Sequence, residues 1–101
     1  MSVKTVMTPD EVKEKLEKGE KMNVIDVREH EEVAEGMIPG AKHIPLGEIQ
    51  ERANELEKGK EYIMVCRSGN RSGMATEYLN SQGFTCINMV GGMMNWTGKV
   101  K

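Results

Sequence analysis

The sequence predicts an α/β fold in which a parallel sheet lies between two layers of helices. Segments typical of strands and of helices alternate along all 101 residues. The clearest strands, Met22–Val27 and Glu61–Cys66, are mostly apolar, as expected where helices cover both faces of a sheet. Apolar residues make up 38% of the chain, which is enough for one core at this length. We therefore expect residues 1–101 to form a single domain.

The first half of the chain is expected to contain three strands separated by helical segments. Thr8 and Pro9 suit the cap and the first turn of a helix, and Gly19 suits its end. The stretch 28–35 is rich in charge and is long enough for one or two helical turns. The strands of this half are predicted at 3–6, 22–27 and 41–44.

The second half predicts two amphipathic helices, one after Pro45 and one that begins near Ser72 and ends at Gly83. The residues that should face the core are Leu46, Ile49, Ala53 and Leu56 in the first helix, and Met74, Ala75, Tyr78 and Leu79 in the second. The remaining elements are strands at 61–66 and 86–90, and a short terminal helix that follows Gly91 and Gly92 and contains Trp96.

Composition and charge exclude several classes of function. The chain has 14 Lys and Arg against 16 Asp and Glu, so no excess positive charge is available to bind nucleic acid. No apolar run approaches the ~20 residues of a membrane span, and no secretion signal begins the sequence. Cys66, Cys86, His30 and His43 match no disulfide framework or metal pattern. We expect a cytoplasmic protein with no metal, no cofactor, and no nucleic-acid or membrane partner.

The chemistry is expected at Cys66, which ends a buried strand and precedes a helix. In open parallel sheets, ligands bind at the edge formed by the carboxyl ends of the strands, which is where Cys66 is expected to lie. The N–H groups of the loop, the positive end of the helix dipole and the guanidinium groups of Arg67 and Arg71 all favour a thiolate. We therefore expect the pKa of Cys66 to lie below its ordinary value. Gly69 suits the loop, because curling the backbone around an anion requires a positive φ.

A purely structural Cys66 is the alternative, because cysteine at a strand end is often only a small apolar residue. The surrounding sequence favours the reactive interpretation. The pattern Cys-x-x-Gly-x-Arg-Ser spans residues 66–72, and no large apolar side chain lies between Cys66 and Met74. Cys86 would be able to resolve an oxidised Cys66, but its apolar surroundings predict a buried residue.

At this pattern the sequence resembles the rhodanese family of sulfurtransferases, and the resemblance covers nearly the whole chain. Further blocks that match the family are Asp26-Val27-Arg28-Glu29, the stretch from Glu35 to Leu46, and Gly91-Gly92 followed by Trp96. The resemblance implies a three-layer fold in which helices flank both faces of a five-stranded parallel sheet. One position departs from the family: Met37 stands where histidine is common.

The resemblance also implies a reaction. Cys66 would take sulfane sulfur from thiosulfate or a persulfide donor and hold it as a persulfide. A thiol, cyanide or a sulfur-relay protein would then accept it. Arg71 would stabilise the anionic donor, and backbone amides of the loop would hold the outer sulfur. The loop residues implied in substrate binding are Arg67, Ser68, Gly69, Asn70 and Ser72.

Asp26 and Arg28 follow a neighbouring strand, and we expect them to support the site without touching substrate. Asp26 can brace the following turn by accepting hydrogen bonds from the backbone, and Arg28 can pair with an acid such as Glu35. His43 lies in a predicted short strand and is expected to be a satisfied, partly buried imidazole.

Two other functions stay open on the sequence alone. One is a small cysteine phosphatase or arsenate reductase, because those enzymes also place a low-pKa cysteine in a loop that ends in arginine. The four residues between Cys66 and Arg71 are one fewer than in those loops, which favours sulfur over a tetrahedral oxyanion. The other is a non-catalytic interaction module of the same fold, which the presence of both Cys66 and Arg71 argues against.

Overall fold

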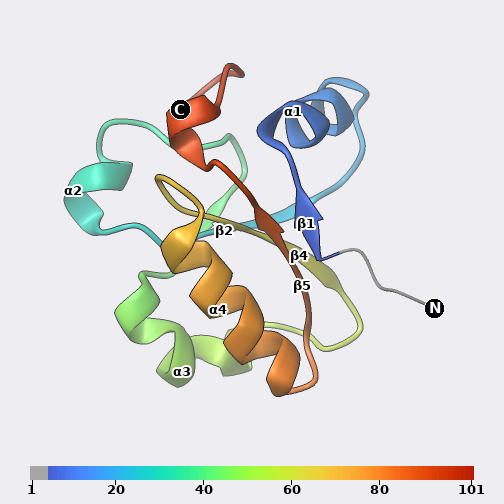
Figure 1. The fold of residues 1–101 in the computed structure, drawn as a ribbon, viewed down its shortest axis with the longest axis vertical. Coiled ribbons are helices and arrows are strands. Elements are labelled where there is room, and N and C mark those ends of the chain that lie inside the picture. Colours follow the sequence, from blue (N-terminus) through green and yellow to red (C-terminus); the bar gives the residue numbers. More distant parts are fainter. Residues whose placement is uncertain (1–4) are drawn as a thin grey trace.

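Five parallel strands form the centre of the molecule, in the order β1-β5-β4-β2-β3 (Figure 1). The structure, a computed structural model, describes residues 5–101. All neighbouring strands pair in parallel, which confirms the predicted five-stranded parallel sheet. The strand predicted at 3–6 overlaps β1 at Val6, and residues 3 and 4 lie outside the described part. The strands are β1 (Val6–Met7), β2 (Asn23–Asp26), β3 (Lys42–His43), β4 (Glu61–Val65) and β5 (Thr85–Met89).

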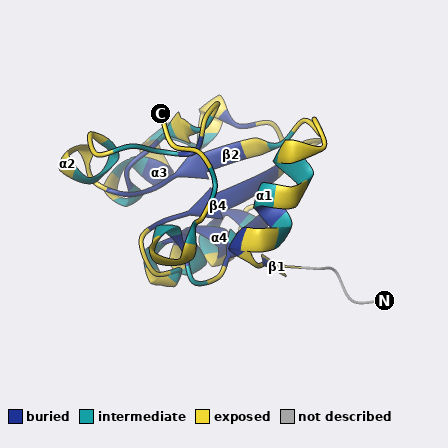
Figure 2. Ribbon diagram, turned by 90° about the horizontal axis from the view of Figure 1, so that it is seen from above, coloured by how far each residue is buried: buried dark blue, intermediate teal, exposed yellow. Residues whose placement is uncertain are grey.

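Helices cover both faces of the sheet, as predicted. Strand β4 shows how the two faces are built, because successive side chains point to opposite sides. Met64 and Cys66 join the core shared with α3 and α4, whereas Ile63 and Val65 join the core shared with α1. Figure 2 shows the buried strands and the largely exposed α2. The helices are α1 (Pro9–Glu17), α2 (His30–Val33), α3 (Ile49–Arg52) and α4 (Asn70–Ser81), with 3₁₀ turns at 46–48, 53–55 and 93–95. None of the helices within residues 5–101 is long and apolar enough to cross a membrane.

Helix α1 begins as its sequence predicts. Thr8 and Glu11 cap it reciprocally: the Glu11 N–H donates to the Thr8 hydroxyl at 3.1 Å, and the Thr8 N–H donates to the Glu11 carboxylate at 2.9 Å. Pro9 occupies the first turn, where its missing N–H costs no helical hydrogen bond. Local residues thus account for this helix start.

The segment after Pro45 differs from the predicted continuous helix. It is broken into a 3₁₀ turn at 46–48, the four-residue α3 and a second 3₁₀ turn at 53–55. The predicted apolar face is kept, with Ile49 and Leu56 buried and Leu46 and Ala53 packed against them. The backbone bends because tertiary packing of the apolar face, and not helical continuity, supplies most of the stability of short helices.

Helix α4 begins at Asn70, slightly before the predicted start, and its buried face is turned relative to the prediction. Met74, expected in the core, is 56% exposed, and Tyr78 is only partly buried. The residues that α4 buries are Ser72, Ala75, Thr76 and Leu79. Thr76 tolerates burial because its hydroxyl donates to the Ser72 carbonyl oxygen at 2.7 Å. Hydrophobic spacing fails here because half of the buried face is polar.

Candidate active site

Cys66 lies at the carboxyl edge of the sheet, between β4 and α4, as the sequence predicts. Cys66 is fully buried, with 0% of the residue exposed. Gly69 turns the chain into α4 with a φ of +101°, a conformation that side-chain-bearing residues rarely adopt. A Cβ at Gly69 would also lie 3.0 Å from the Gly91 backbone nitrogen. The loop therefore requires glycine at this position for two reasons, the turn and the close approach.

Hydrogen-bond donors of the loop and of the start of α4 surround the Cys66 sulfur. The Gly69 N–H donates to Sγ at 3.0 Å, and the Ser72 hydroxyl oxygen lies 3.3 Å from Sγ. Burial is the largest single influence and raises the pKa of the thiol, but hydrogen bonds from the Ser72 hydroxyl and from the N–H groups of Ser72, Gly69 and Ser68 outweigh it. The pKa of Cys66 is therefore lowered. This is the direction predicted from the sequence, but hydrogen bonds rather than the two arginines are the leading cause.

The segment after β5 covers this loop. The Met93 N–H donates to the Cys66 carbonyl oxygen at 2.8 Å, and the Met94 N–H donates to the Arg67 carbonyl oxygen at 2.9 Å. Gly92 approaches so closely that an added Cβ would lie 2.5 Å from the Cys66 carbonyl oxygen. The sequence predicted the glycine pair as the start of a short helix, whereas the structure also places Gly92 against the loop that follows Cys66.

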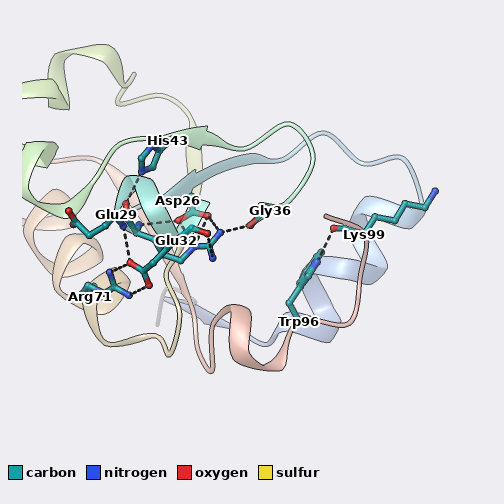
Figure 3. A network of polar contacts seen from close by, with 9 residues as sticks. Asp26, Glu29, Glu32, Gly36, His43, Arg71, Trp96 and Lys99 are labelled. Carbon is teal, nitrogen blue, oxygen red and sulfur yellow. Dashed lines mark hydrogen bonds and ion pairs between the residues drawn. The ribbon is translucent and has the colours of Figure 1, made fainter. Parts of the chain in front are cut away.

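Arg71 forms an ion pair with Glu32 of α2 (Figure 3). Its two terminal nitrogens donate to the two carboxylate oxygens at 2.6 and 2.8 Å. This contact, together with the Glu29 N–H, overcomes desolvation and lowers the pKa of Glu32 to about 2, and it raises the pKa of Arg71. A weaker Coulombic interaction links Arg71 to Cys66. The sequence prediction missed Glu32, whose one signal is its spacing from Glu29 in a helix cap.

Asp26, labelled in Figure 3, forms a buried ion pair with Arg28. The Arg28 guanidinium donates to the Asp26 carboxylate at 2.8 Å and to the Gly36 carbonyl oxygen at 2.8 Å. The Arg28 N–H also donates to Asp26 at 3.0 Å, which is the predicted bracing of the turn. Arg28 thus pairs with an acid as predicted, but that acid is Asp26 and not the suggested Glu35. His43 is partly buried and bonded as expected, with Nε2 2.7 Å from the Arg28 carbonyl oxygen.

A second missed residue, Asn88 of β5, contacts the loop from the sheet. The Ser72 hydroxyl donates to Asn88 Oδ1 at 2.6 Å, and Asn88 Nδ2 donates to the Gly69 carbonyl oxygen at 3.1 Å. Its sequence signal is a polar residue inside an otherwise apolar strand. The Asn88 side chain thereby links Gly69, which turns the loop, to Ser72, whose hydroxyl contacts the Cys66 sulfur.

A hollow of about 380 Å³ opens beside the loop that follows Cys66, between α2 and the 3₁₀ turn at 93–95. Of the exposed loop residues Arg67, Ser68 and Asn70, only Arg67 lines this hollow. The residues that line it are Arg28, Glu32, Glu35, Arg67, Met93 and Met94. The hollow therefore has charged side chains of both signs on one part of its lining and the apolar side chains of Met93 and Met94 on another.

Cys86 is buried and free, as predicted for a residue within a strand. Burial raises the pKa of its thiol to about 11. Cys66 is also free. The two thiols therefore differ in acidity although both are buried.

Comparisons with known proteins agree on one family. The model of the Rhodanese-like domain matches residues 8–99. A Bacillus subtilis protein named "Putative sulfurtransferase YtwF" is 52% identical over 101 residues, covering 100% of this chain and 97% of that protein. "Putative sulfur carrier protein YrkF" of the same organism is 49% identical, covering 88% of this chain and 49% of that protein. The crystal structure of a rhodanese-like domain protein from Staphylococcus aureus superposes with a TM-score of 0.90 at 38% identity, covering 98% and 97% of the two chains.

Proposed function

This chain belongs to the rhodanese-like family, and from that premise we propose that it transfers sulfane sulfur through a persulfide on Cys66. Family membership and a relative named as a sulfurtransferase support sulfurtransferase activity in general. The finer proposal concerns the donor, the intermediate and the acceptor. The donor is thiosulfate or a persulfide, and the acceptor is a thiol or cyanide.

The observation that carries the proposal is the surroundings of the Cys66 sulfur. An N–H group and a hydroxyl converge on a sulfur whose pKa is lowered, at the start of a helix. This arrangement favours a nucleophilic thiolate, and the same N–H groups suit a second sulfur that carries negative charge once it is bound.

The proposed reaction has two steps. The Cys66 thiolate attacks the sulfane sulfur of thiosulfate, a new S–S bond forms, and the old S–S bond breaks so that sulfite leaves with its electron pair. An acceptor thiolate or cyanide then attacks the outer sulfur, and the electron pair of the broken bond returns to Cys66. Neither step requires an external oxidant or reductant.

We propose supporting roles for the nearby charges. Arg71 stabilises the anionic donor and sulfite, and Glu32 holds its guanidinium at the mouth of the loop. Arg67 attracts anions toward the hollow that it lines. Asp26 and Arg28 brace the turn behind the site.

Sulfur-relay proteins are the proposed partners, alongside small donors. The name of YrkF describes a sulfur carrier, which supports a place for this chain in protein-to-protein sulfur transfer. We also propose a reducing location such as the cytoplasm, because the reaction requires Cys66 as a free thiol.

Mass spectrometry after incubation with thiosulfate tests this function. We expect one added sulfur on Cys66 that cyanide or a dithiol removes, and none on the Cys66→Ala variant. Cys86→Ala is the matched control and should load normally, because Cys86 lies within the sheet. Equal loading of Cys66→Ala would contradict the assignment of the nucleophile.

The same preparation separates the alternatives. Faster hydrolysis of an aryl phosphate than transfer of sulfur would favour the phosphatase or arsenate-reductase alternative. A protein that takes up no sulfur from thiosulfate or from any persulfide donor would favour the non-catalytic interaction module.

A further inference from the structure

The contacts of Asn88 determine the direction of the hydrogen bonds beside Cys66. A carbonyl oxygen can only accept, so the group 3.1 Å from the Gly69 carbonyl oxygen must be the Asn88 NH₂. The Asn88 oxygen therefore faces the Ser72 hydroxyl at 2.6 Å. Because an amide oxygen also only accepts, Ser72 is the donor in this bond.

Ser72 has one hydroxyl hydrogen and two places to direct it. Its oxygen lies 2.6 Å from Asn88 Oδ1 and 3.3 Å from Cys66 Sγ. When the hydrogen points to Asn88, the Ser72 oxygen can only accept at the sulfur, which suits a neutral S–H group. When the hydrogen points to the sulfur, it stabilises a thiolate and the Asn88 oxygen loses this donor.

We propose that Asn88 is a positioning residue that competes with the Cys66 sulfur for the hydroxyl hydrogen of Ser72. The hydrogen stays on the Ser72 oxygen throughout, and only its direction changes. It turns to the sulfur when the thiol proton leaves to solvent, and it returns to Asn88 when the sulfur is neutral or carries a second sulfur. This inference rests on the proposed function of Cys66 as the nucleophile.

The competition has a testable sign. Removing the Asn88 acceptor frees the Ser72 hydrogen for the thiolate, so it should lower the pKa of Cys66 further. A loop anchor without proton competition predicts the opposite, because loss of the Gly69 contact would loosen the N–H groups around the sulfur. The charged groups near this edge are Arg67, Arg71, Glu29, Glu32, Glu35, Asp26 and Arg28, and the variants below leave all of them in place.

The experiment is the pH dependence of Cys66 alkylation by iodoacetamide, read on the Cys66 peptide by mass spectrometry. We expect Asn88→Ala to lower the pKa of Cys66 by about half a pH unit or more, the size of one hydrogen bond. In the Ser72→Ala background, Asn88→Ala should cause no change, because no hydroxyl hydrogen is left to redirect.

Asn88→Asp gives a second, nearly isosteric variant. It keeps an acceptor for Ser72, loses the donor to Gly69 and adds a negative charge that disfavours the thiolate, so all three effects should raise the pKa of Cys66, and the opposite shift in Asn88→Ala is what identifies the competition. A shift in the same direction for Asn88→Ala and Asn88→Asp would overturn the proposal, as would an unchanged or raised pKa in Asn88→Ala, or an equal shift with and without Ser72.

Asn80→Ala is the matched control. Asn80 joins α4 to β5 in a similar way, since its side chain bonds the backbone N–H and carbonyl oxygen of Cys86 at 2.7 and 3.1 Å. We expect this variant to leave the pKa of Cys66 unchanged. The titration needs no sulfur donor, so a failed proton competition and a failed persulfide assay are distinguishable outcomes.

Discussion

The two cysteines of this chain belong to the same hydrophobic core, yet the pKa values of their thiols are shifted in opposite directions. Cys66 follows the end of β4, where the chain leaves the sheet and its N–H groups turn toward the sulfur. Cys86 lies inside β5, where the backbone groups are used in the sheet. Burial raises the thiol pKa at both positions, and only the donors at Cys66 reverse the direction. A buried thiol can therefore have a lowered pKa if the backbone around it is free to donate hydrogen bonds to the sulfur.

Alkylation rates test this contrast most directly. With the pKa of Cys86 raised to about 11 and that of Cys66 lowered, the thiolate fraction at pH 7 should differ by at least about a hundredfold. Because a more acidic thiolate is intrinsically less nucleophilic, we expect iodoacetamide to label Cys66 at least about ten times faster than Cys86 in the native protein. Comparable rates in the folded state, with unfolded protein as the reference, would remove the contrast.

Gly92→Ala should disturb the loop that supplies the hydrogen-bond donors to Cys66. Its Cβ would lie within 2.5 Å of the Cys66 carbonyl oxygen, at a φ of +59°. We expect a loss of about 2 kcal/mol in the free energy of unfolding, together with slower Cys66 alkylation. Urea unfolding measures the first effect. Gly47→Ala is the control, because nothing lies within 4 Å of its added Cβ; equal losses would contradict the packing explanation.

Arg71→Ala tests how much the charges add to the donors at Cys66. We expect kcat/KM for thiosulfate to fall about tenfold, because a charge-assisted contact to the donor is lost. The pKa of Cys66 should rise slightly, since Arg71 interacts with it only through a weaker Coulombic contribution. Thiocyanate formation measures the rate, with Arg67→Ala for comparison. Unchanged loading and an unchanged thiol pKa would leave Arg71 without the proposed role.

Glu32→Gln should have the smallest effect, about 1 kcal/mol at pH 7, because the pair with Arg71 is partly exposed. The folded state lowers the pKa of Glu32 from 4.5 to about 2. The pair therefore stabilises the protein fully above pH 4.5, and this contribution is lost as the pH falls toward 2. Unfolding at pH 7 and at pH 3 should show the difference from wild type shrinking. The exposed Glu31→Gln serves as control, and a difference independent of pH would argue against the ion pair.

Much of the fold could be predicted because its signals are local. Apolar runs identified β2 and β4, and the Thr8–Glu11 cap identified the start of α1. The segment after Pro45 was predicted with the right buried residues and the wrong backbone. A periodic pattern indicates which side chains face the core, but the backbone conformation of such short helical segments is determined by tertiary packing.

The candidate site divides in the same way. Cys66 and Gly69 were predictable because strand, loop and helix follow one another within a few residues. The partner of Arg71 was not, because Glu32 lies 39 residues away on a helix of one turn. An acidic partner for Arg28 was predicted with Glu35 as the example, but Asp26, two residues away, is the acid buried with it.

The sequence by itself determined the order of strands and helices along the chain and the place of Cys66 at the end of a strand, since these depend on residues close together in the chain. Only the tertiary structure decided which acid holds Arg71, which amide bonds Ser72, and why Gly92 must lack a side chain. Each of these contacts joins elements far apart in the chain. Their energies depend on distances of a few ångströms that exist only after the helices have packed on the sheet.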